Sequence, residues 1–346
     1  MKLSYTLMYD GDPRAAADQV ADLEKAGIDL VWVAEAYGFD SPTLMGYLAA
    51  KTERVEIGSA ILNIYSRTPG TLLQTAAGLD NVSGGRAVLG LGASGPQVIE
   101  GWHGVPYAKP LGRTAEIIDL VRRGLKRETL TSDGVFKLPL SKEDGGVTGL
   151  GKSLKMLTHP ERDSIPIWIA ALGPKSVEQA ATIADGWLPH LFHPERSHLV
   201  WGDALNSGLA QREPDLGPLQ IAAGGMVAIG EGPETKALLD FVRPLFALYV
   251  GGMGAKGKNF YNDVAKAYGY EQEAEEIQDL YLSGKKKEAE ALVPTEWLEA
   301  CNLVGPASYV KERIAAFREA GVTHLTVMPA SDDPAATVAQ VKEWVA

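Results

Sequence analysis

Joints of one kind recur along this chain, and they restrict its fold more than any other feature. Lys25-Ala26-Gly27-Ile28-Asp29 and Glu319-Ala320-Gly321-Val322-Thr323 each end a helical pattern with Ala-Gly and continue into an apolar run. Ala184-Asp185-Gly186-Trp187 is a looser version. A glycine just beyond a helix accepts the left-handed conformation that ends it. Such joints are typical of repeated β/α units, in which each helix returns the chain to a parallel strand.

Short apolar segments recur at the spacing that such units require. Runs that are apolar nearly throughout, such as 29–34, belong to parallel sheets covered on both faces. The segments are 3–8, 29–34, 55–62, 86–92, 165–170, 186–188, part of 219–229, and 322–327. Each is followed by a helical pattern, so together they predict a (β/α)8 TIM barrel of the α/β class. A doubly wound open sheet is the alternative, but it would seldom need eight such units.

Two stretches interrupt the alternation of strands and helices. Residues 129–160 are polar and rich in turn residues, which predicts a hairpin and loop after the fourth helix. The glycine-rich residues 251–258 lead into a helical insertion that ends near residue 300, before the eighth strand. We therefore expect one barrel domain over 1–346 with two insertions, about 129–160 and 251–300. The glycine density of 251–258 suggests a lid over the substrate.

Charge and cysteine content restrict the partners. The formal net charge of −11 would repel nucleic acid and anionic membranes. Cys301 is the single cysteine, which excludes an internal disulfide framework and fits a reducing compartment. No apolar window approaches the length of a membrane span. We expect a cytoplasmic protein that acts on a small molecule.

The stretch 83–104 contains the most open backbone of the chain. Gly90-Leu91-Gly92-Ala93-Ser94-Gly95 matches the G-x-G-x-x-G pattern of dinucleotide-binding folds. That pattern requires a helix opening on the last glycine, whereas Pro96 follows here and residues 100–104 look like a loop. We therefore interpret Gly92 to Gly95 as a ligand site at a strand end, where backbone can approach a ligand closely.

In a barrel of this type, ligands lie over the carboxyl ends of the strands. Glu35 follows the second strand and could bond a ring N–H or transfer a proton, although a capping or salt-bridging acid is equally consistent. His103 is the best candidate acid or base by residue type, although a single loop histidine is more often structural. The loop Leu172-Gly173-Pro174-Lys175-Ser176 combines a helix start with a lysine, which favours a phosphate site as much as a plain helix start.

Two other chemistries find little support. His190 and His193 end a strand before Pro194, and no acidic or cysteine ligand accompanies them in sequence, so we expect no metal site. No G-x-S-x-G elbow is present for a Ser-His-Asp hydrolase.

These residues resemble the bacterial luciferase-like superfamily, and within it the coenzyme F420-dependent oxidoreductases, including the methylenetetrahydromethanopterin reductases. The resemblance covers nearly the whole chain. The segments that carry it are Val33-Ala34-Glu35-Ala36-Tyr37-Gly38, Asn63-Ile64-Tyr65-Ser66-Arg67-Thr68-Pro69, Ser83-Gly84-Gly85-Arg86, Leu89-Gly90-Leu91-Gly92, Gly101-Trp102-His103-Gly104-Val105-Pro106, Ala170-Ala171-Leu172-Gly173-Pro174-Lys175 and Ala184-Asp185-Gly186-Trp187.

The resemblance implies a barrel that holds a deazaflavin over its strand ends and transfers a hydride between C5 of that ring and a small organic substrate. It also implies a cis peptide between Ala60 and Ile61, and a homodimer. The cofactor-binding residues that it implies, together with the glycines of the open loop, are Glu35, Ala60, Ile61, Asn63, Gly92, Ala93, Ser94, Gly95, Leu172, Gly173, Lys175 and Ser176.

One departure from the family pattern is informative. The sugar-phosphate dehydrogenases of this superfamily carry an Asp-His pair after the second strand, where this chain has Glu35-Ala36, and their glutamate after the fourth strand is Gly95 here. This argues against the sugar-phosphate reaction and leaves Glu35, His103 and Tyr65 as candidates for proton transfer. A flavin monooxygenase that uses FMN and a non-catalytic deazaflavin-binding protein are the alternative functions.

Overall fold

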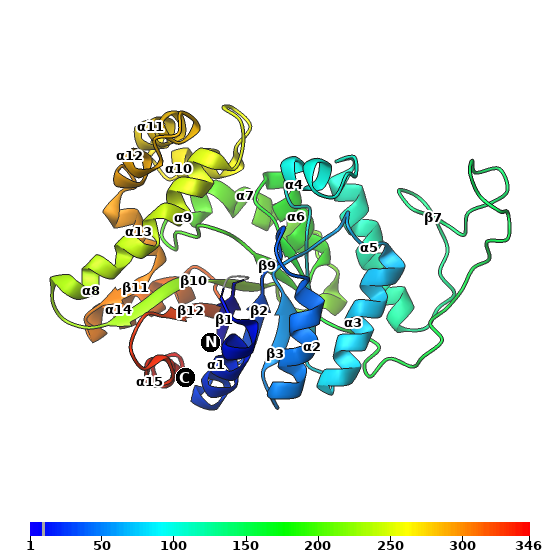
Figure 1. The fold of residues 1–346 in the computed structure, drawn as a ribbon, viewed down its shortest axis with the longest axis horizontal. Helices are drawn as coiled ribbons and strands as arrows, with labels where there is room; N and C mark the ends of the chain where they lie inside the picture. Colours follow the sequence, from blue (N-terminus) through cyan, green and yellow to red (C-terminus); the bar gives the residue numbers. More distant parts are fainter. Residues whose placement is uncertain (9–10) are drawn as a thin grey trace.

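Eight parallel strands close into a barrel within residues 1–8 and 11–346, the part of the chain that the computed structural model describes (Figure 1). Their order around the barrel is β1-β2-β3-β5-β8-β9-β10-β12, and β12 pairs with β1 to complete the circle. The predicted (β/α)8 fold is confirmed. The barrel strands are β1 (Lys2–Leu7), β2 (Leu30–Val33), β3 (Glu56–Ser59), β5 (Ala87–Gly92), β8 (Ile167–Ala170), β9 (Gly186–Leu188), β10 (Gln220–Ile229) and β12 (His324–Pro329).

Long helices surround the barrel and begin where the sequence supplies caps. α1 starts at Pro13 after Asp12, whose side chain accepts from the Arg14 N–H at 2.9 Å, and it ends at Gly27 with φ at 114°. A large apolar core fills the space between strands and helices. The surrounding helices are α1 (Pro13–Ala26), α2 (Ser41–Lys51), α3 (Pro69–Ser83), α5 (Pro110–Leu125), α6 (Pro174–Ile183), α7 (Ser197–Ala210), α14 (Ala307–Glu319) and α15 (Pro334–Val345).

The segments outside this alternation differ from the predictions in three places. A short helix, α4 (Pro96–Gly101), opens directly after Gly95, where we expected a loop, because Gly95 takes the extended N-cap conformation and Pro96 suits the first helical position. The stretch 233–250, whose sequence predicts one helix, is broken into α8 (Pro233–Ala237), the 3-10 turn Leu238–Phe241 and α9 (Arg243–Ala247). The π-helical turn at its end, Leu248–Gly252, takes in Gly251 and Gly252, which we expected to be loop.

A further strand, β11 (Leu303–Gly305), escaped the sequence analysis because three residues are too few to show a period. It pairs with the far end of β10, beyond the barrel wall. The remaining elements are β4 (Leu62–Asn63), β6 (Ser132–Asp133), β7 (Lys137–Leu138), α8 (Pro233–Ala237), α9 (Arg243–Ala247), α10 (Phe260–Ala267), α11 (Glu271–Leu282), α12 (Lys286–Ala291), α13 (Thr295–Cys301) and the 3-10 turns Pro214–Leu216 and Leu238–Phe241. Within the described residues, no helix combines the length and the apolar character that crossing a bilayer would require.

Two tryptophans fill the inside of the barrel. Trp32 on β2 and Trp168 on β8 meet edge to face, with ring centroids 5.1 Å apart, although β3 and β5 separate their strands in the sheet. They therefore meet across the interior. His324 on β12 lies at 90° to Trp168, with ring centroids 5.1 Å apart. The two indoles form, with Leu30, Val88 and Ala222, an inner core separate from the outer one.

Glycines on the neighbouring strands make room for these rings. Gly58 is directly opposite Trp32 on β3, and a Cβ there would lie 2.4 Å from the indole. Gly186 is opposite Trp168 on β9, and a Cβ there would lie 2.1 Å from that indole. Indole rings packed in a barrel have no free rotamer to escape to, so neither position tolerates a side chain.

We predict that Gly58→Ala and Gly186→Ala each lower the free energy of unfolding by about 2 kcal/mol, because the added methyl overpacks the interior. Urea unfolding followed by tryptophan fluorescence measures this. Gly78→Ala is the matched control, since this exposed α3 position has open space at Cβ, and it should gain about 0.5 kcal/mol in helix propensity. Equal stabilities for Gly58→Ala and Gly78→Ala would contradict this account of the interior.

His324 gives the barrel a pH dependence. Burial, helped by Lys2 and the amino terminus and opposed by Asp29, lowers the pKa of His324 to about 4. Below about pH 6.5, His324 therefore binds a proton in the unfolded chain but not in the folded one. Its contribution to the free energy of unfolding is fully present above about pH 6.5 and is lost as the pH falls toward 4. We predict a loss of about 3 kcal/mol from this group.

The measurement is the free energy of unfolding between pH 7 and 4.5 for the parent, His324→Gln and His198→Gln, an exposed control. The slope should flatten in His324→Gln alone. An unchanged slope in that variant would show that the interior histidine does not titrate in this way.

Candidate functional site

The loops at the carboxyl ends of the strands bring together most of the predicted site residues. Asn63 ends β4, Ala93 to Gly95 follow β5, and Leu172 to Ser176 follow β8. In Figure 1, α4 and the insertion helices α10 to α12 lie at the same, upper end of the molecule. The insertion therefore lies at the end of the barrel that these loops occupy.

Asn63 and His103 form the polar centre of this end. Asn63 is buried, and its Oδ1 accepts the backbone N–H groups of Tyr65 at 3.1 Å and Ser66 at 2.7 Å. Its Nδ2 therefore faces His103 Nε2, 3.3 Å away. An amide nitrogen can only donate, so Nε2 accepts and the neutral His103 ring carries its proton on Nδ1. The His103 residue is partly exposed, which leaves it accessible to a ligand.

Tyr65 is fully engaged by its neighbours. Its hydroxyl donates to the Ala108 carbonyl at 3.1 Å, its ring stacks on that of Tyr107 with centroids 5.1 Å apart, and the Arg113 guanidinium lies over the ring, 4.7 Å from its centroid. Burial is the main cause that raises the pKa of Tyr65. The Tyr107 hydroxyl in turn reaches the Ser94 carbonyl at 3.4 Å. Tyr65 therefore supports, through Tyr107, the loop Ala93 to Gly95.

Glu35 belongs to an ion-pair network. Its two carboxylate oxygens accept from Arg67 at 2.7 and 2.9 Å, and the Ser41 N–H donates to it at 2.9 Å. Arg67 also bonds Asp40 at 2.7 Å. Burial disfavours the charged guanidinium, but the hydrogen bonds to Glu35 and Asp40 outweigh this and raise the pKa of Arg67. Both oxygens of Glu35 are thus occupied, and the network ties the loop after β2 to the loop after β4.

The strand end at Ala60 and Ile61 has the cis peptide bond that the resemblance implied. The side chain of Ile61 covers Gly92, where an added Cβ would lie 3.0 Å from Ile61 Cγ1 and Cδ1. Gly92 is therefore buried, with Ile61 against it, and is less open than we expected; its role in holding a cofactor stays a prediction. The backbone that a ligand can reach is limited to Ala93, Ser94 and Gly95, where Ser94 has a positive φ of 56°.

The loop after β8 has the features of an anion site. α6 begins at Pro174 with Gly173 as N-cap, no side chain caps it, and no acidic residue lies in its first turn. The Lys175 side chain is exposed and has no ion-pair partner among the described residues, while Ser176 Oγ donates to the Gly173 carbonyl at 2.8 Å. The uncapped helix start and the lysine together favour an anionic group. Leu172, the first residue of this loop, packs on the core and its carbonyl accepts from Trp201 Nε1 at 2.8 Å.

Sequence reasoning missed an aromatic cluster that the insertion contributes. The His190 ring lies 4.1 Å from that of Tyr249 and 5.7 Å from that of Tyr261. Burial lowers the pKa of His190 to about 4, so this ring is neutral at neutral pH. Phe260 likewise lies against Gly173, with its ring 3.4 Å from a Cβ placed there. The sequence shows only that Tyr249 and Tyr261 flank the glycine-rich residues 251–258. No regular spacing connects these tyrosines to His190.

The loop that carries His190 is held in a strained conformation. Leu191 has a φ of 54°, which is unfavourable for a branched apolar residue. Tyr268 of the insertion fixes it, since its hydroxyl donates to the Leu191 carbonyl and accepts from the His193 N–H, both at 3.2 Å. The insertion is thus bonded to the barrel at this point. No group of three or more metal-ligating side chains occurs among the residues that the structure describes.

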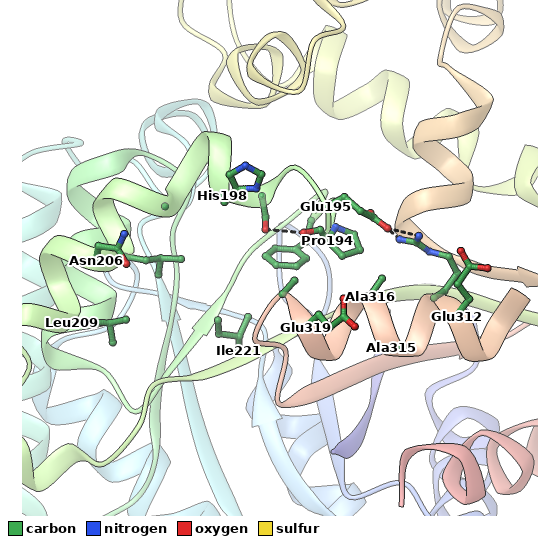
Figure 2. Close-up of a pocket in the computed structure, with 16 residues that line it drawn as sticks. Pro194, Glu195, His198, Asn206, Leu209, Ile221, Glu312, Ala315, Ala316 and Glu319 are labelled. Carbon is green, nitrogen blue, oxygen red and sulfur yellow. Dashed lines mark hydrogen bonds and ion pairs between the residues drawn. The ribbon is translucent and has the colours of Figure 1, made fainter.

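A cavity of about 710 Å³ lies elsewhere, between α7 and α14, and none of the predicted site residues lines it (Figure 2). Ile221 forms part of its floor, with Glu312 and Glu319 on α14 at its rim. Ala222, the next residue, belongs to the inner core, so Ile221 points outward and the cavity lies outside the barrel. The candidate site is therefore the group of strand-end loops and not this cavity.

Comparison with known proteins agrees with this geometry. The family model described as luciferase-like monooxygenase matches residues 1–324. The chain is 42% identical to a Mycobacterium tuberculosis protein named "Putative coenzyme F420-dependent oxidoreductase Rv3520c", over 96% of both chains. It is 26% identical to the 5,10-methylenetetrahydromethanopterin reductase of Archaeoglobus fulgidus, over 87% of this chain and 85% of that protein.

A solved structure supports the fold as well. The coenzyme F420-dependent tetrahydromethanopterin reductase from Methanopyrus kandleri superimposes with a TM-score of 0.81 at 21% identity, over 99% of this chain and 98% of the other. The barrel, its strand-end loops and these similarities lead to one conclusion: the chain belongs to the luciferase-like monooxygenase family and is a luciferase-like oxidoreductase.

Proposed function

We propose that this protein is a coenzyme F420-dependent oxidoreductase that transfers a hydride between C5 of the deazaflavin and a small organic substrate. The observation that carries the proposal is the 42% identity, over 96% of both chains, to a protein whose name specifies coenzyme F420. The geometry of the strand-end loops is consistent with it, because a flat ring and a phosphate each find suitable residues there.

The residues fit the two ends of such a cofactor. The uncapped start of α6 and Lys175 suit its phosphate, with Ser176 beside them. The exposed backbone of Ala93 to Gly95 and the polar pair Asn63 and His103 suit its ring system. When bound, a deazaflavin supplies or accepts a hydride, and the protein orients it and excludes water. The neutral ring of His190 and its tyrosine neighbours offer a largely apolar wall on the insertion side.

Among the three candidates for proton transfer, His103 is the one that the geometry favours. Glu35 has both carboxylate oxygens bonded to Arg67, and the Tyr65 hydroxyl is bonded to Ala108. His103 is partly exposed, and Asn63 holds its Nε2 so that Nδ1 carries the transferable proton. We therefore assign proton transfer to His103 and a supporting role to Glu35 and Tyr65.

The name of the family model, luciferase-like monooxygenase, favours a monooxygenase as the second candidate, and we would expect such an enzyme to use FMN. The phosphate of FMN would bind at the same start of α6, so the phosphate site does not distinguish FMN from coenzyme F420. The relative affinity for the two cofactors does distinguish them. The third candidate, a deazaflavin-binding protein without turnover, would show no hydride transfer.

Binding measurements distinguish the two cofactors. Titration of the cofactor-free protein, followed by tryptophan fluorescence, should give at least about 10-fold tighter binding of coenzyme F420 than of FMN. Lys175→Ala should weaken F420 binding about 10-fold through loss of the phosphate contact, yet leave binding of the phosphate-free deazaflavin unchanged. Lys236→Ala, a lysine on α8 paired with Glu299, is the control. Tighter binding of FMN than of F420 would favour the monooxygenase.

Kinetics test the assignment of proton transfer to His103. Replacement by Gln should lower the rate of substrate turnover by about 100-fold or more, because general acid–base catalysis contributes this much, while F420 affinity changes little. Stopped-flow absorbance of the deazaflavin and equilibrium titration measure the two quantities separately. Equal losses in Tyr65→Phe and His103→Gln would contradict the assignment of the proton to His103.

A further inference from the structure

Three large aromatic side chains lie exposed at the carboxyl ends of the strands. Tyr37 and Phe39 belong to the loop after β2, and Trp102 ends α4, the helix that follows β5. Their exposed fractions are 67%, 73% and 65%. We call these three residues the aromatic rim. Large apolar side chains that gather at one place on the surface of a soluble protein usually mark a binding surface.

Two rings of the rim meet although their loops follow different strands. The ring centroids of Tyr37 and Trp102 are 6.4 Å apart. In the barrel wall β3 lies between β2 and β5, and the chain continues from β3 through β4 to Asn63. The contact therefore joins the loops on either side of the one that carries Asn63. Trp102 also directly precedes His103, whose Nε2 lies 3.3 Å from Asn63 Nδ2, so the rim borders this polar pair.

The backbone that presents these rings is held in place. Arg67 bonds Glu35 at 2.7 and 2.9 Å and Asp40 at 2.7 Å, so one guanidinium ties both ends of the short loop after β2. The Trp102 N–H donates to the Val98 carbonyl at 2.9 Å. Rings exposed on a fixed backbone form a preorganised surface, because little backbone freedom is left to lose when a ligand binds.

The chemistry of the rim selects a flat, uncharged ligand. Aromatic rings pack against other flat π systems in stacked or edge-to-face arrangements, which adds to the gain from burying apolar area. A saturated, puckered ring offers no such face. An anionic group finds little attraction in the loop after β2, because Arg67 is already shared by Glu35 and Asp40.

We propose that the aromatic rim is the platform that binds the substrate, and that the substrate is an uncharged, flat conjugated compound such as an aromatic ketone or a cyclic enone. This assignment rests on the proposed F420-dependent hydride transfer. The residues that suit the cofactor belong to the loops after β5 and β8, whereas the rim belongs to the loop after β2 and to the end of α4. Stacking on the rim holds the conjugated system beside His103, to which we assign proton transfer.

Binding of two matched ketones tests this. Tetralone and decalone share a skeleton of two fused six-membered rings, but tetralone has an aromatic ring conjugated with its carbonyl, whereas decalone is saturated and puckered. Ligand-observed NMR titration of the full chain, with and without coenzyme F420, should show at least about 10-fold tighter binding of tetralone. Phe39→Leu and Trp102→Leu should each lower this ratio to about 2-fold or less, because leucine keeps apolar area but has no ring face.

Matched variants separate the ring from the fold. Trp102→Phe keeps a ring and should keep the preference for tetralone. Phe241→Leu is the control, because this ring is 75% exposed in the 3-10 turn Leu238–Phe241, and it should leave both affinities unchanged. Circular dichroism with thermal unfolding should show the same fold in all variants. Affinity for coenzyme F420 should stay within about 2-fold in Phe39→Leu and Trp102→Leu, because the rim does not hold the cofactor.

The possible failures are distinguishable. The absence of measurable tetralone binding, equal affinities of the parent for the two ketones, or a preference that survives both leucine variants would overturn the platform. Loss of coenzyme F420 binding in the leucine variants would place the rim in the cofactor site and would overturn it as well. A parent that binds no coenzyme F420 would instead refute the proposed function, while the ratio of the two ketone affinities would still decide whether the rim selects flat ligands.

Discussion

The contact of Trp32 with Trp168 inside the barrel is the constraint on which the rest of the structure depends. Two indoles from opposite walls occupy the interior, and the strands can close around them only because Gly58 and Gly186 stand opposite. Closing the sheet into a barrel fixes the tilt of the strands and their stagger relative to one another, and so fixes how their ends are arranged. The positions of Asn63, Ala93 and Gly173 at one end of the molecule follow from that closure and not from any local preference of those residues.

The strand-end loops are then held by contacts between loops. Arg67 joins the loop after β4 to that after β2 through Glu35, and Asn63 joins it to His103 in the loop that follows α4. Tyr268 of the insertion fixes the loop after β9. Buried ion pairs and side-chain hydrogen bonds of this kind hold the loops in one arrangement, because breaking one of them leaves an unpaired polar group. The site is thus rigid where the polar groups meet and open where Ser94 and Lys175 reach solvent.

The sequence predicted the fold class, and it predicted which strand-end loops would lie together at one end of the barrel, because both follow from the order of strands, helices and their joints. It could not reveal that the Ile61 side chain lies against Gly92, since the position of the segment before β4 relative to β5 depends on strand register. The helix after Gly95 was missed because the six residues 96–101 are too few to show helical periodicity. The approach of Tyr249 and Tyr261 to His190 joins residues 59 and 71 positions apart in the chain, and no regular spacing connects them.

By itself, the sequence determined that this protein would alternate strands and helices, leave acidic charge on its surface and place glycines, a histidine and a lysine after particular strands. These are local properties of residue type and period. Only the tertiary structure decided which of them meet: that Arg67 binds both carboxylate oxygens of Glu35, and that Asn63 orients His103. The reason is physical, since such contacts depend on closure of the barrel and on the burial that closure permits.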